Sequence, residues 1–473
     1  MTEINANLPS LEELRDQTYE ALKDWTADPI FGSPLSHLAL FEQARLDSNG
    51  NVRLATNRVL EAALNRLAVR HDREAELLRL RFLNQLPAHA VANRLHAAEA
   101  TIYRWQNQAL DLLAETLLDM ERQVLQDRVT VLESRLEPPS YTRLFGVDEH
   151  RARLLDVLLP AEPPWLISVE GIGGIGKTSL VDAVMRAAIR QTLAGDIAWV
   201  SARQQRLDLG GRIRDLHTPA LTTERLLEEL AIQLLPGTPP FTSQAQAMAA
   251  LRNRFSERPP IVVVDNLETV HDVETLLPLL RRLAGPAKFL LTTRQSLFAE
   301  ADMFHFGVPE LGLPDALQLI RQEATLRNLP QVAGAADAEL SPIFETVGGN
   351  PLALRLVVGQ VHVHPLDSIL DDLQAARGRP IENLYSYIYR QAWDGLSELC
   401  RRALLAFPLV PEQGGDQALL AAISGLEQPH LRDALQELVS LNLVDGRGDL
   451  SQRRYTVHGL TRTFLMEQVA RWQ

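Results

Sequence analysis

Eight residues near the middle of the chain have the spacing G-x-x-x-x-G-K-[ST], running from Gly171 to Thr178. Glycines let the backbone curl until successive N–H groups point at one phosphate, and a following helix N-terminus adds partial positive charge. In this pattern Lys177 reaches the β- and γ-phosphates, and the Thr178 hydroxyl ligates Mg²⁺. The motif predicts a nucleoside triphosphate site whose binding residues are Gly171, Gly173, Gly174, Ile175, Gly176, Lys177, Thr178 and Ser179.

Lysine is rare in this chain. Of the 47 Lys and Arg residues, only Lys23, Lys177 and Lys288 are lysines. A chain that uses Arg almost everywhere still has Lys at the phosphate position, where a compact ammonium fits and a broad planar guanidinium does not. This favours phosphate binding over the alternative, a Gly-rich turn in front of a helix.

A P-loop enzyme also needs a carboxylate for Mg²⁺ at the C-terminal end of a neighbouring strand. Asp265 directly follows the apolar run 261–264, so we predict Thr178 and Asp265 as the metal ligands. Hydrolysis further requires a group that orients or deprotonates water. Asn266 stands where a second acid would serve, which leaves Glu268 as the nearest candidate base and predicts slow ATP hydrolysis.

These groups need strands and helices to position them. The apolar run 165–169 before the P-loop is typical of a buried strand, and residues 179–190 after it predict a helix. Strands that alternate with helices predict an α/β P-loop NTPase fold, a parallel sheet with helices on both faces. From about residue 313 to 376 the pattern becomes purely helical. The other predicted strands are 196–201, 261–264, 288–293 and 304–308, and the other predicted helices of this part lie near 223–235 and 244–255.

Composition excludes several classes of protein. The net charge of −13 argues against a nucleic-acid coat along the whole chain and against a polybasic membrane anchor. The single cysteine, Cys400, excludes an internal disulfide and a cysteine zinc site. The polar, acidic N-terminus does not fit a signal peptide, and no apolar run approaches about 18 residues. We therefore expect a soluble cytoplasmic protein without a membrane partner.

The chain resembles the NB-ARC group of STAND ATPases, the nucleotide switches of plant immune receptors, apoptosome proteins and many bacterial regulators. The resemblance covers about residues 140–473. It rests on the P-loop core Gly-Gly-Ile-Gly-Lys-Thr and on four further segments that match the group's second strand, sensor strand, Gly-x-Pro-Leu-Ala motif and Met-His-Asp region, namely 197–201, 289–294, 348–354 and 455–460.

For the phosphates, the resemblance implies that Arg294 contacts the γ-phosphate. Arg294 then joins Lys177, Asp265 and Glu268 as the predicted catalytic residues. The structural alternative is that Arg294 is a surface residue at the end of a strand.

For the base and the ADP-bound state, the resemblance implies that Pro351 packs on adenine and that His458 contacts the β-phosphate of ADP. Phe145 and Gly146 belong to a box near adenine that lacks the group's arginine. Gly459 replaces the aspartate of the Met-His-Asp motif, so we expect a less tightly held ADP state. The alternatives are a first helical residue for Pro351 and a buried, hydrogen-bonded histidine for His458.

The expected domains follow from these segments and from the Pro-rich break at 137–140. At 473 residues three or four domains are expected. We predict an all-α domain at 1–137, a P-loop nucleotide-binding domain at 138–310, a helical domain at 311–380 and a winged-helix domain at 381–473.

Residues 86–110 resemble a helix-turn-helix, similar to region four of sigma factors and to response regulators. His96 stands in the turn where that motif usually has glycine. Residues 51–110 carry nine Arg against five acidic residues, which suits phosphate contacts. A helical protein-interaction module is the alternative. If the second helix enters a major groove, the side chains that face DNA are Thr101, Arg104, Gln106 and Asn107.

The chain is thus expected to be an ATP/ADP-controlled STAND signalling switch that uses Mg²⁺, acting in bacterial defence or stress signalling. ADP holds a closed monomer, and exchange for ATP opens it and allows homo-oligomers to form. The alternatives are a nucleotide-switched transcription regulator that binds DNA and a structural nucleotide-binding scaffold without turnover. Because only about fifteen residues follow His458, we expect a sensor or effector protein in trans.

Overall fold

The computed structural model of the chain describes most of its residues, and all structural statements below refer to these described residues. They are 8–26, 32–191, 195–203, 205–207, 212–215, 221–267, 270–285, 287–361, 364–374, 384, 391–411, 413–448, 453–458, 460–462 and 464–466.

The chain divides into two compact units. The first comprises Met1–Ser134 with the short segment Ile189–Leu193, and the second comprises Arg135–Ala188 with Ala194–Gln473. Each unit buries hydrophobic clusters of its own.

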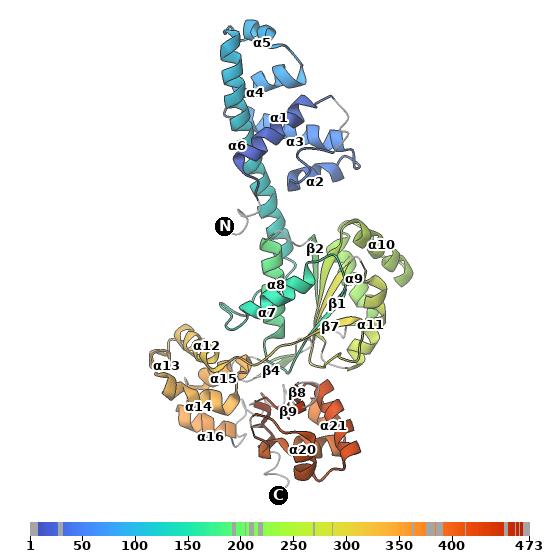
Figure 1. Ribbon diagram of the computed structural model, residues 1–473, viewed down its shortest axis with the longest axis vertical. Helices are drawn as coiled ribbons and strands as arrows, with labels where there is room; N and C mark the ends of the chain where they lie inside the picture. The colour runs from blue at the N-terminus through green and yellow to red at the C-terminus, as the bar shows by residue number, and fades with distance from the viewer. Residues whose placement is uncertain are drawn as a thin grey trace. The chain divides into compact units, whose positions relative to one another are not determined.

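The first unit is all-α, as predicted (Figure 1). Two of its helices begin with polar caps: the Ser10 side chain accepts from the Glu13 N–H and the Asn51 side chain from the Leu54 N–H. The helices are α1 (Leu11–Lys23), α2 (Ala39–Leu46), α3 (Val52–Ala68), α4 (Asp72–Leu78), the π-helical turn η2 (Arg79–Leu83), α5 (Ala88–Arg94) and α6 (Glu99–Glu133).

Helices α5 and α6 are joined by a turn in which His96 adopts a positive φ of 51°. This is the left-handed backbone that favours glycine, which agrees with the place that His96 takes in the motif. Helix α6 is 35 residues long, far beyond the short second helix of the motif. Its apolar face recurs at helical spacing, with Ile102, Ala109 and Leu113 buried.

Gln106 falls on that buried face, so its assignment to a DNA-facing surface is wrong. Its side chain is only 6% exposed, and its Oε1 accepts a hydrogen bond from the Arg81 guanidinium at 3.0 Å. The reason is helical periodicity: a residue four after Ile102 and three before Ala109 points to the core.

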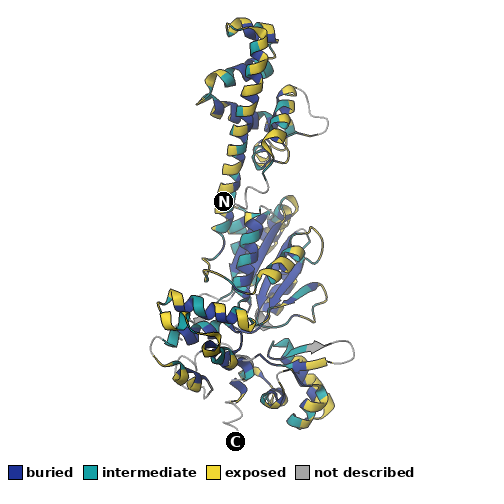
Figure 2. Cartoon of the chain, turned by 60° about the vertical axis from the view of Figure 1, so that its left-hand side comes forward, coloured by how far each residue is buried: buried dark blue, intermediate teal, exposed yellow. Residues whose placement is uncertain are grey.

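The second unit is built on the predicted parallel sheet. Its strands are ordered β2-β5-β6-β1-β7, and every neighbouring pair is parallel. All five residues of β1 and all six of β6 are buried, because a parallel sheet is covered on both faces (Figure 2). The strands are β1 (Leu166–Glu170), β2 (Asp196–Ser201), β5 (Pro260–Leu267), β6 (Lys288–Thr293) and β7 (Met303–Gly307).

Helices lie on both faces of this sheet (Figure 1). Thr222 and Ser243 cap the N-termini of two of them through their side-chain oxygens. One face carries α7 (Asp148–Leu158) and α8 (Lys177–Arg190), and the other carries α9 (Thr223–Leu234), α10 (Gln244–Glu257) and α11 (Val270–Leu283). A small antiparallel ribbon of β3 (Gln205–Leu207) and β4 (Ile213–Asp215) was not anticipated from the sequence.

The strand that carries Asp265 is not adjacent to the P-loop strand, contrary to the expectation. Strand β6 lies between β5 and β1. The register of β5 against β6 also shifts between Val264 and Leu267, where Asn266 has a positive φ of 68°. Local apolar runs predict strands but carry no information about their order in the sheet.

The rest of the second unit is mainly helical and contains a β-ribbon near its C-terminal end. The helical prediction for residues 313–376 is confirmed over its described part. The elements are α12 (Leu313–Leu326), α13 (Pro330–Ala333), α14 (Asp337–Val347), α15 (Pro351–Val361), α16 (Leu366–Gln374), α18 (Gln391–Gly395), α19 (Glu398–Leu404), the 3₁₀ turn η4 (Phe407–Leu409), α20 (Gln417–Ser424), α21 (Gln428–Ser440), β8 (Asp445–Gly448) and β9 (Arg453–Thr456).

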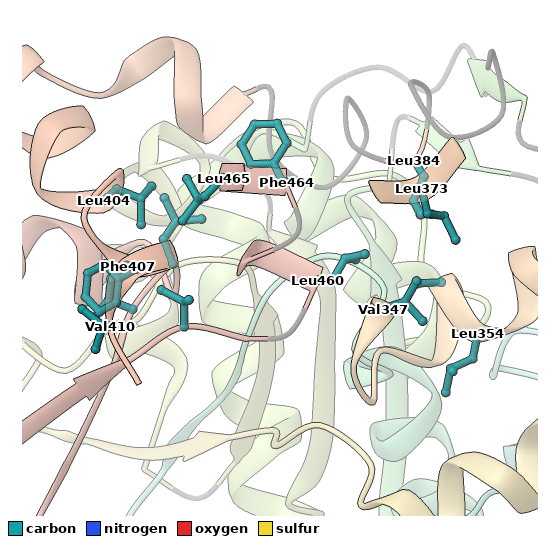
Figure 3. Close-up of a cluster of buried hydrophobic side chains, with 14 of the residues drawn as sticks. Val347, Leu354, Leu373, Leu384, Leu404, Phe407, Val410, Leu460, Phe464 and Leu465 are labelled. Atoms are coloured by element: carbon teal, nitrogen blue, oxygen red, sulfur yellow. The ribbon is translucent and has the colours of Figure 1, made fainter. Parts of the chain in front are cut away.

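One hydrophobic cluster runs through these helices. Figure 3 shows Val347 of α14 and Leu354 of α15 together with Phe407 of η4 and Leu460, all of them buried members of the same cluster. The β8–β9 ribbon follows α21 as an antiparallel pair. A winged-helix assignment for this part of the chain stays a prediction.

Candidate nucleotide site

The P-loop connects β1 to α8 and has the backbone that its glycines predict. Gly174 has a φ of 78° and Gly176 a φ of 105°, both in the left-handed region. At Gly174 an added Cβ would lie 2.7 Å from the Leu352 Cβ, so a larger residue does not fit there. The loop therefore requires glycine here for both backbone and space.

Lys177 is the first residue of α8 and points into the loop. Its Nζ donates hydrogen bonds to the carbonyl oxygens of Gly171 at 2.6 Å and Ile172 at 2.9 Å. The ammonium is thus held inside the curve of the backbone, at the place where the motif binds phosphate.

The two predicted metal ligands meet. Thr178 Oγ1 donates to Asp265 Oδ1 at 2.7 Å, and Thr292 Oγ1 of the intervening strand β6 donates to the same oxygen at 2.7 Å. Asp265 has no exposed surface. A hydroxyl and a buried carboxylate fit Mg²⁺, which is typically held by one or two carboxylates together with phosphate oxygens and water.

Arg203 completes this cluster, and the sequence did not point to it. Its Nη2 donates to Asp265 Oδ2 at 3.0 Å. Arg203 follows the end of β2, and β2 pairs with β5 so that Ser201 lies opposite Asp265. Only the order of strands in the sheet brings this arginine to the carboxylate predicted to hold the metal. Thr292 lies in the segment 289–294 that resembles the sensor strand, and it likewise had no predicted role at the site.

A cavity of about 270 Å³ opens beside the P-loop. Pro351 lines this cavity and is also the first residue of α15, as its structural alternative expects; its packing on adenine stays a prediction. Six of the residues predicted to bind the nucleotide line it: Phe145, Gly146, Ile175, Gly176, Ser179 and Pro351.

Three polar side chains on the cavity wall, those of Tyr141, Glu323 and Arg355, are held by hydrogen bonds or ion pairs. Tyr141 donates to Asp182 Oδ2 at 2.6 Å, and burial, with this hydrogen bond, raises the pKa of Tyr141 above its ordinary value. Arg355 and Glu323 form an ion pair at 2.6 Å. These three groups, with the apolar residues around them, suit a ligand that is flat and has hydrogen-bonding edges.

The next segment to contact the P-loop is the start of α15. Asn350 is fully buried, and its Nδ2 donates to the Gly173 carbonyl at 3.1 Å. The Leu352 N–H donates to the Gly174 carbonyl at 3.3 Å. Asn350 belongs to the segment 348–354 that resembles the Gly-x-Pro-Leu-Ala motif, but it had no predicted role.

Arg294 lies directly after β6 and does not line the cavity. Its backbone N–H donates to the Leu267 carbonyl at 3.3 Å, and its own carbonyl accepts from Asn442 Nδ2 at 2.9 Å. The Ser296 N–H donates to the Ser440 carbonyl at 2.6 Å. The loop that carries Arg294 is therefore hydrogen-bonded to the end of α21.

His458 is buried between two acidic side chains. Its Nδ1 lies 3.5 Å from Glu310 Oε1, and its Nε2 lies 3.8 Å from Asp445 Oδ2. Glu310 lines the cavity, whereas His458 does not. The candidate base Glu268 and the replaced motif residue Gly459 lie outside the described residues.

In the first unit, the residues predicted to face DNA separate into two sets. Arg104 and Asn107 are exposed and Thr101 is partly exposed, all near the start of α6. Gln106 belongs to the core instead.

Two kinds of feature, a metal-binding cluster and a membrane-crossing helix, are absent from the described residues. Nowhere in the described part of the chain do three His, Cys, Asp or Glu side chains gather into a metal-binding cluster. The described helices also include none with both the length and the apolar character needed to cross a membrane.

No protein-family model matches the chain. It is 26% identical over 241 residues to the probable disease resistance RPP8-like protein 2 of Arabidopsis thaliana, covering 50% of this chain and 25% of that protein. It is 25% identical over 318 residues to the regulatory protein AfsR of Streptomyces griseus, covering 63% of this chain and 29% of that protein. The chain thus spans little more than a quarter of the length of these relatives.

Among solved structures, the chain is similar to a signal transduction ATPase with numerous domains (STAND) from Pyrococcus horikoshii that has a tetratricopeptide repeat sensor. The identity is 15%, the TM-score is 0.30, and the match covers 70% of this chain and 43% of that chain. A match to the Drosophila ORC bound to DNA has 17% identity and a TM-score of 0.35, and covers 74% of this chain and 99% of that chain. The site geometry and the sequence relatives together support a nucleotide site in a protein of the P-loop NTPase fold.

Proposed function

We propose that this chain is an ATP/ADP-controlled signalling switch of the STAND type. The observation that carries the proposal is the direct hydrogen bonding between the P-loop and the start of α15, from Asn350 to Gly173 and from Leu352 to Gly174. Because the same loop binds the phosphates, a change at the phosphates alters the surface on which α15 rests.

A second route joins the site to the C-terminal elements. The loop after β6 holds Arg294 and is hydrogen-bonded to Ser440 and Asn442. His458 lies beside Glu310, a residue of the cavity wall. A ligand with different affinities for two arrangements of these contacts shifts the equilibrium between them.

In this proposal each residue has a defined task. The P-loop N–H groups and Lys177 bind the phosphates, and the cavity beside Phe145 and Pro351 holds the base. Thr178 and Asp265 hold Mg²⁺, which neutralises phosphate charge when bound. Arg294 contacts the γ-phosphate, which is present in ATP and absent from ADP. Turnover is slow, below the ~1 s⁻¹ lower end of typical enzymes, because Asn266 offers no second acid and only Glu268 remains as a base.

The test compares the mass of the protein in solution with ADP and with a non-hydrolysable ATP analogue. ADP should maintain a monomer, and the analogue should produce homo-oligomers in the wild type and none in Lys177→Ala. Light scattering gives the mass, and circular dichroism controls for folding. Identical masses in both nucleotides, with nucleotide binding verified, would leave a structural scaffold as the better description.

A partner in trans completes the proposal. We expect a sensor or effector protein that binds one nucleotide state, in defence or stress signalling within the cytoplasm. Pull-down with ADP, or with the ATP analogue, should recover different partners, and binding of a partner should change nucleotide affinity reciprocally.

A second candidate is nucleotide-switched DNA binding through α5 and α6. It is favoured by the left-handed turn at His96 and by the exposure of Arg104 and Asn107 near the start of α6. Arg104→Ala should weaken binding to a selected DNA site by about 1–3 kcal/mol if the contact is to a base. Arg122→Ala, farther along the same helix, is the control. Equal losses in both variants would indicate charge attraction without sequence recognition.

A further inference from the structure

Arg203 is a cation at the metal site that the proposed function leaves without a task. We propose that Arg203 is a positioning residue that supplies the counter-charge of Asp265 when no metal is bound and thereby sets the Mg²⁺ dependence of nucleotide binding. This inference rests on the proposed nucleotide site.

The burial of Asp265 creates the need for a counter-charge. The carboxylate has no exposed surface, and an ionised group in such a place is costly unless it is paired. Two hydroxyls, from Thr178 and Thr292, bind one of its oxygens. Arg203 binds the other oxygen with a full positive charge. The guanidinium therefore both orients the carboxylate and neutralises it.

Arg203 has a second carboxylate within reach. Its Nη1 lies 3.3 Å from Glu137 Oε2, and the Glu137 side chain is 38% exposed. The backbone around Glu137 is held in place: the Glu137 carbonyl accepts from Arg186 at 2.8 Å, and Arg135 donates to the Ile197 carbonyl of β2 at 2.7 Å. Arg203 is thus shared between one buried and one more exposed acid.

This sharing has a consequence for metal affinity. A dication at Asp265 meets a like charge at hydrogen-bonding distance from the same carboxylate, and such repulsion weakens its binding. The Glu137 carboxylate reduces this repulsion, because it stabilises the Arg203 guanidinium in a position farther from Asp265. Loss of the Arg203 charge and loss of the Glu137 charge should therefore shift Mg²⁺ affinity in opposite directions.

The experiment titrates MgCl₂ into the full-length protein with a fluorescent ADP analogue and follows nucleotide binding rather than hydrolysis. Arg203→Gln keeps a hydrogen-bond donor but removes the charge, and should lower the half-maximal Mg²⁺ concentration at least about threefold. Glu137→Gln should raise it by a similar factor. Arg203→Lys keeps the charge and should stay near the wild-type value.

Arg254→Gln is the matched control. Arg254 is as exposed as Arg203, at 21%, and pairs with the buried Asp196 at the opposite end of β2. It should leave the Mg²⁺ titration unchanged. Asp196 also pairs with Arg135, so the variant removes one of its two partners, and a general effect of weakening a buried ion pair on β2 would appear in it as well.

The Asp265→Asn variant distinguishes a failure of the role proposed for Arg203 from a failure of the proposed metal site. If it abolishes the Mg²⁺ dependence while Arg203→Gln and Glu137→Gln shift the titration in the same direction, or not at all, the role of Arg203 is overturned and the nucleotide site stands. If Mg²⁺ has no influence on analogue binding in the wild type and in Asp265→Asn, the proposed metal site itself fails.

Discussion

The nucleotide end of the sheet and the α5–α6 region of the first unit were both anticipated from short sequence patterns, yet they differ in outcome. At the sheet, Thr178 and Asp265 are 87 residues apart in the chain and meet at 2.7 Å. In α6, one of four residues assigned to a common surface, Gln106, lies in the core.

The difference lies in what each pattern specifies. In the P-loop, residue type and backbone conformation are coupled, because Gly174 and Gly176 have positive φ angles that other residues rarely adopt. In α6, the pattern defines a helix but leaves its rotation to the packing of neighbours such as Arg81. A motif that constrains backbone dihedral angles therefore predicts the positions of site residues better than a motif that only sets residue types along a helix.

The largest expected effect tests whether the two regions belong to independent units. Phe289 is fully buried in β6, and Phe289→Ala should cost about 3–5 kcal/mol of the unfolding free energy of the second unit. Leu110→Ala in α6 should cost about 2–5 kcal/mol in the first unit. Urea unfolding followed by circular dichroism should show each variant shifting a different transition. One shared transition would refute independent unfolding.

The next effect concerns the phosphates. Lys177→Ala should weaken ADP and ATP binding by about a hundredfold or more, equivalent to ~3 kcal/mol, because the only ammonium in the loop is lost. Isothermal calorimetry measures it, and the exposed Lys23→Ala is the control. Unchanged affinity in Lys177→Ala would reject the phosphate assignment.

A smaller effect isolates the contact between the P-loop and α15. Gly174→Ala combines a strained φ of 78° with a contact of 2.7 Å to the Leu352 Cβ, and should weaken nucleotide binding about tenfold. Gly237→Ala has a similar φ of 82° but meets no atom within 4 Å, so it carries the strain without the contact. Equal nucleotide affinities in the two variants would mean that the α15 contact does not matter for binding.

The smallest effects test which residues of α6 face the core and which face solvent. Gln106→Ala removes the acceptor for the Arg81 guanidinium and should cost about 1 kcal/mol of stability. The adjacent, exposed Asn107→Ala should stay within about 0.5 kcal/mol of the wild type. Thermal unfolding of both proteins gives the comparison, and a larger loss in Asn107→Ala would reverse the assignment of the two faces.

The sequence predicted the main elements of the sheet closely. The strands at 196–201 and 288–293 coincide with β2 and β6, because each is a short apolar or β-branched run bounded by polar or turn residues. The strands of the ribbons β3–β4 and β8–β9 were not predicted from the sequence. Their short segments carry no apolar alternation, and Gly446 and Gly448 of β8 argue against a strand.

What the sequence determined by itself was local: the P-loop backbone, the buried strands, the acid near the end of β5 and the alternation that requires a parallel sheet. The tertiary structure alone decided which distant residues join that site. The strand order placed β6 and Thr292 between Asp265 and the P-loop, the pairing of β2 with β5 brought Arg203 to the carboxylate, and the docking of α15 set Asn350 on Gly173. The physical reason is that dihedral preferences and apolar periodicity act over a few residues, whereas strand order and helix rotation minimise the free energy of the whole packed core.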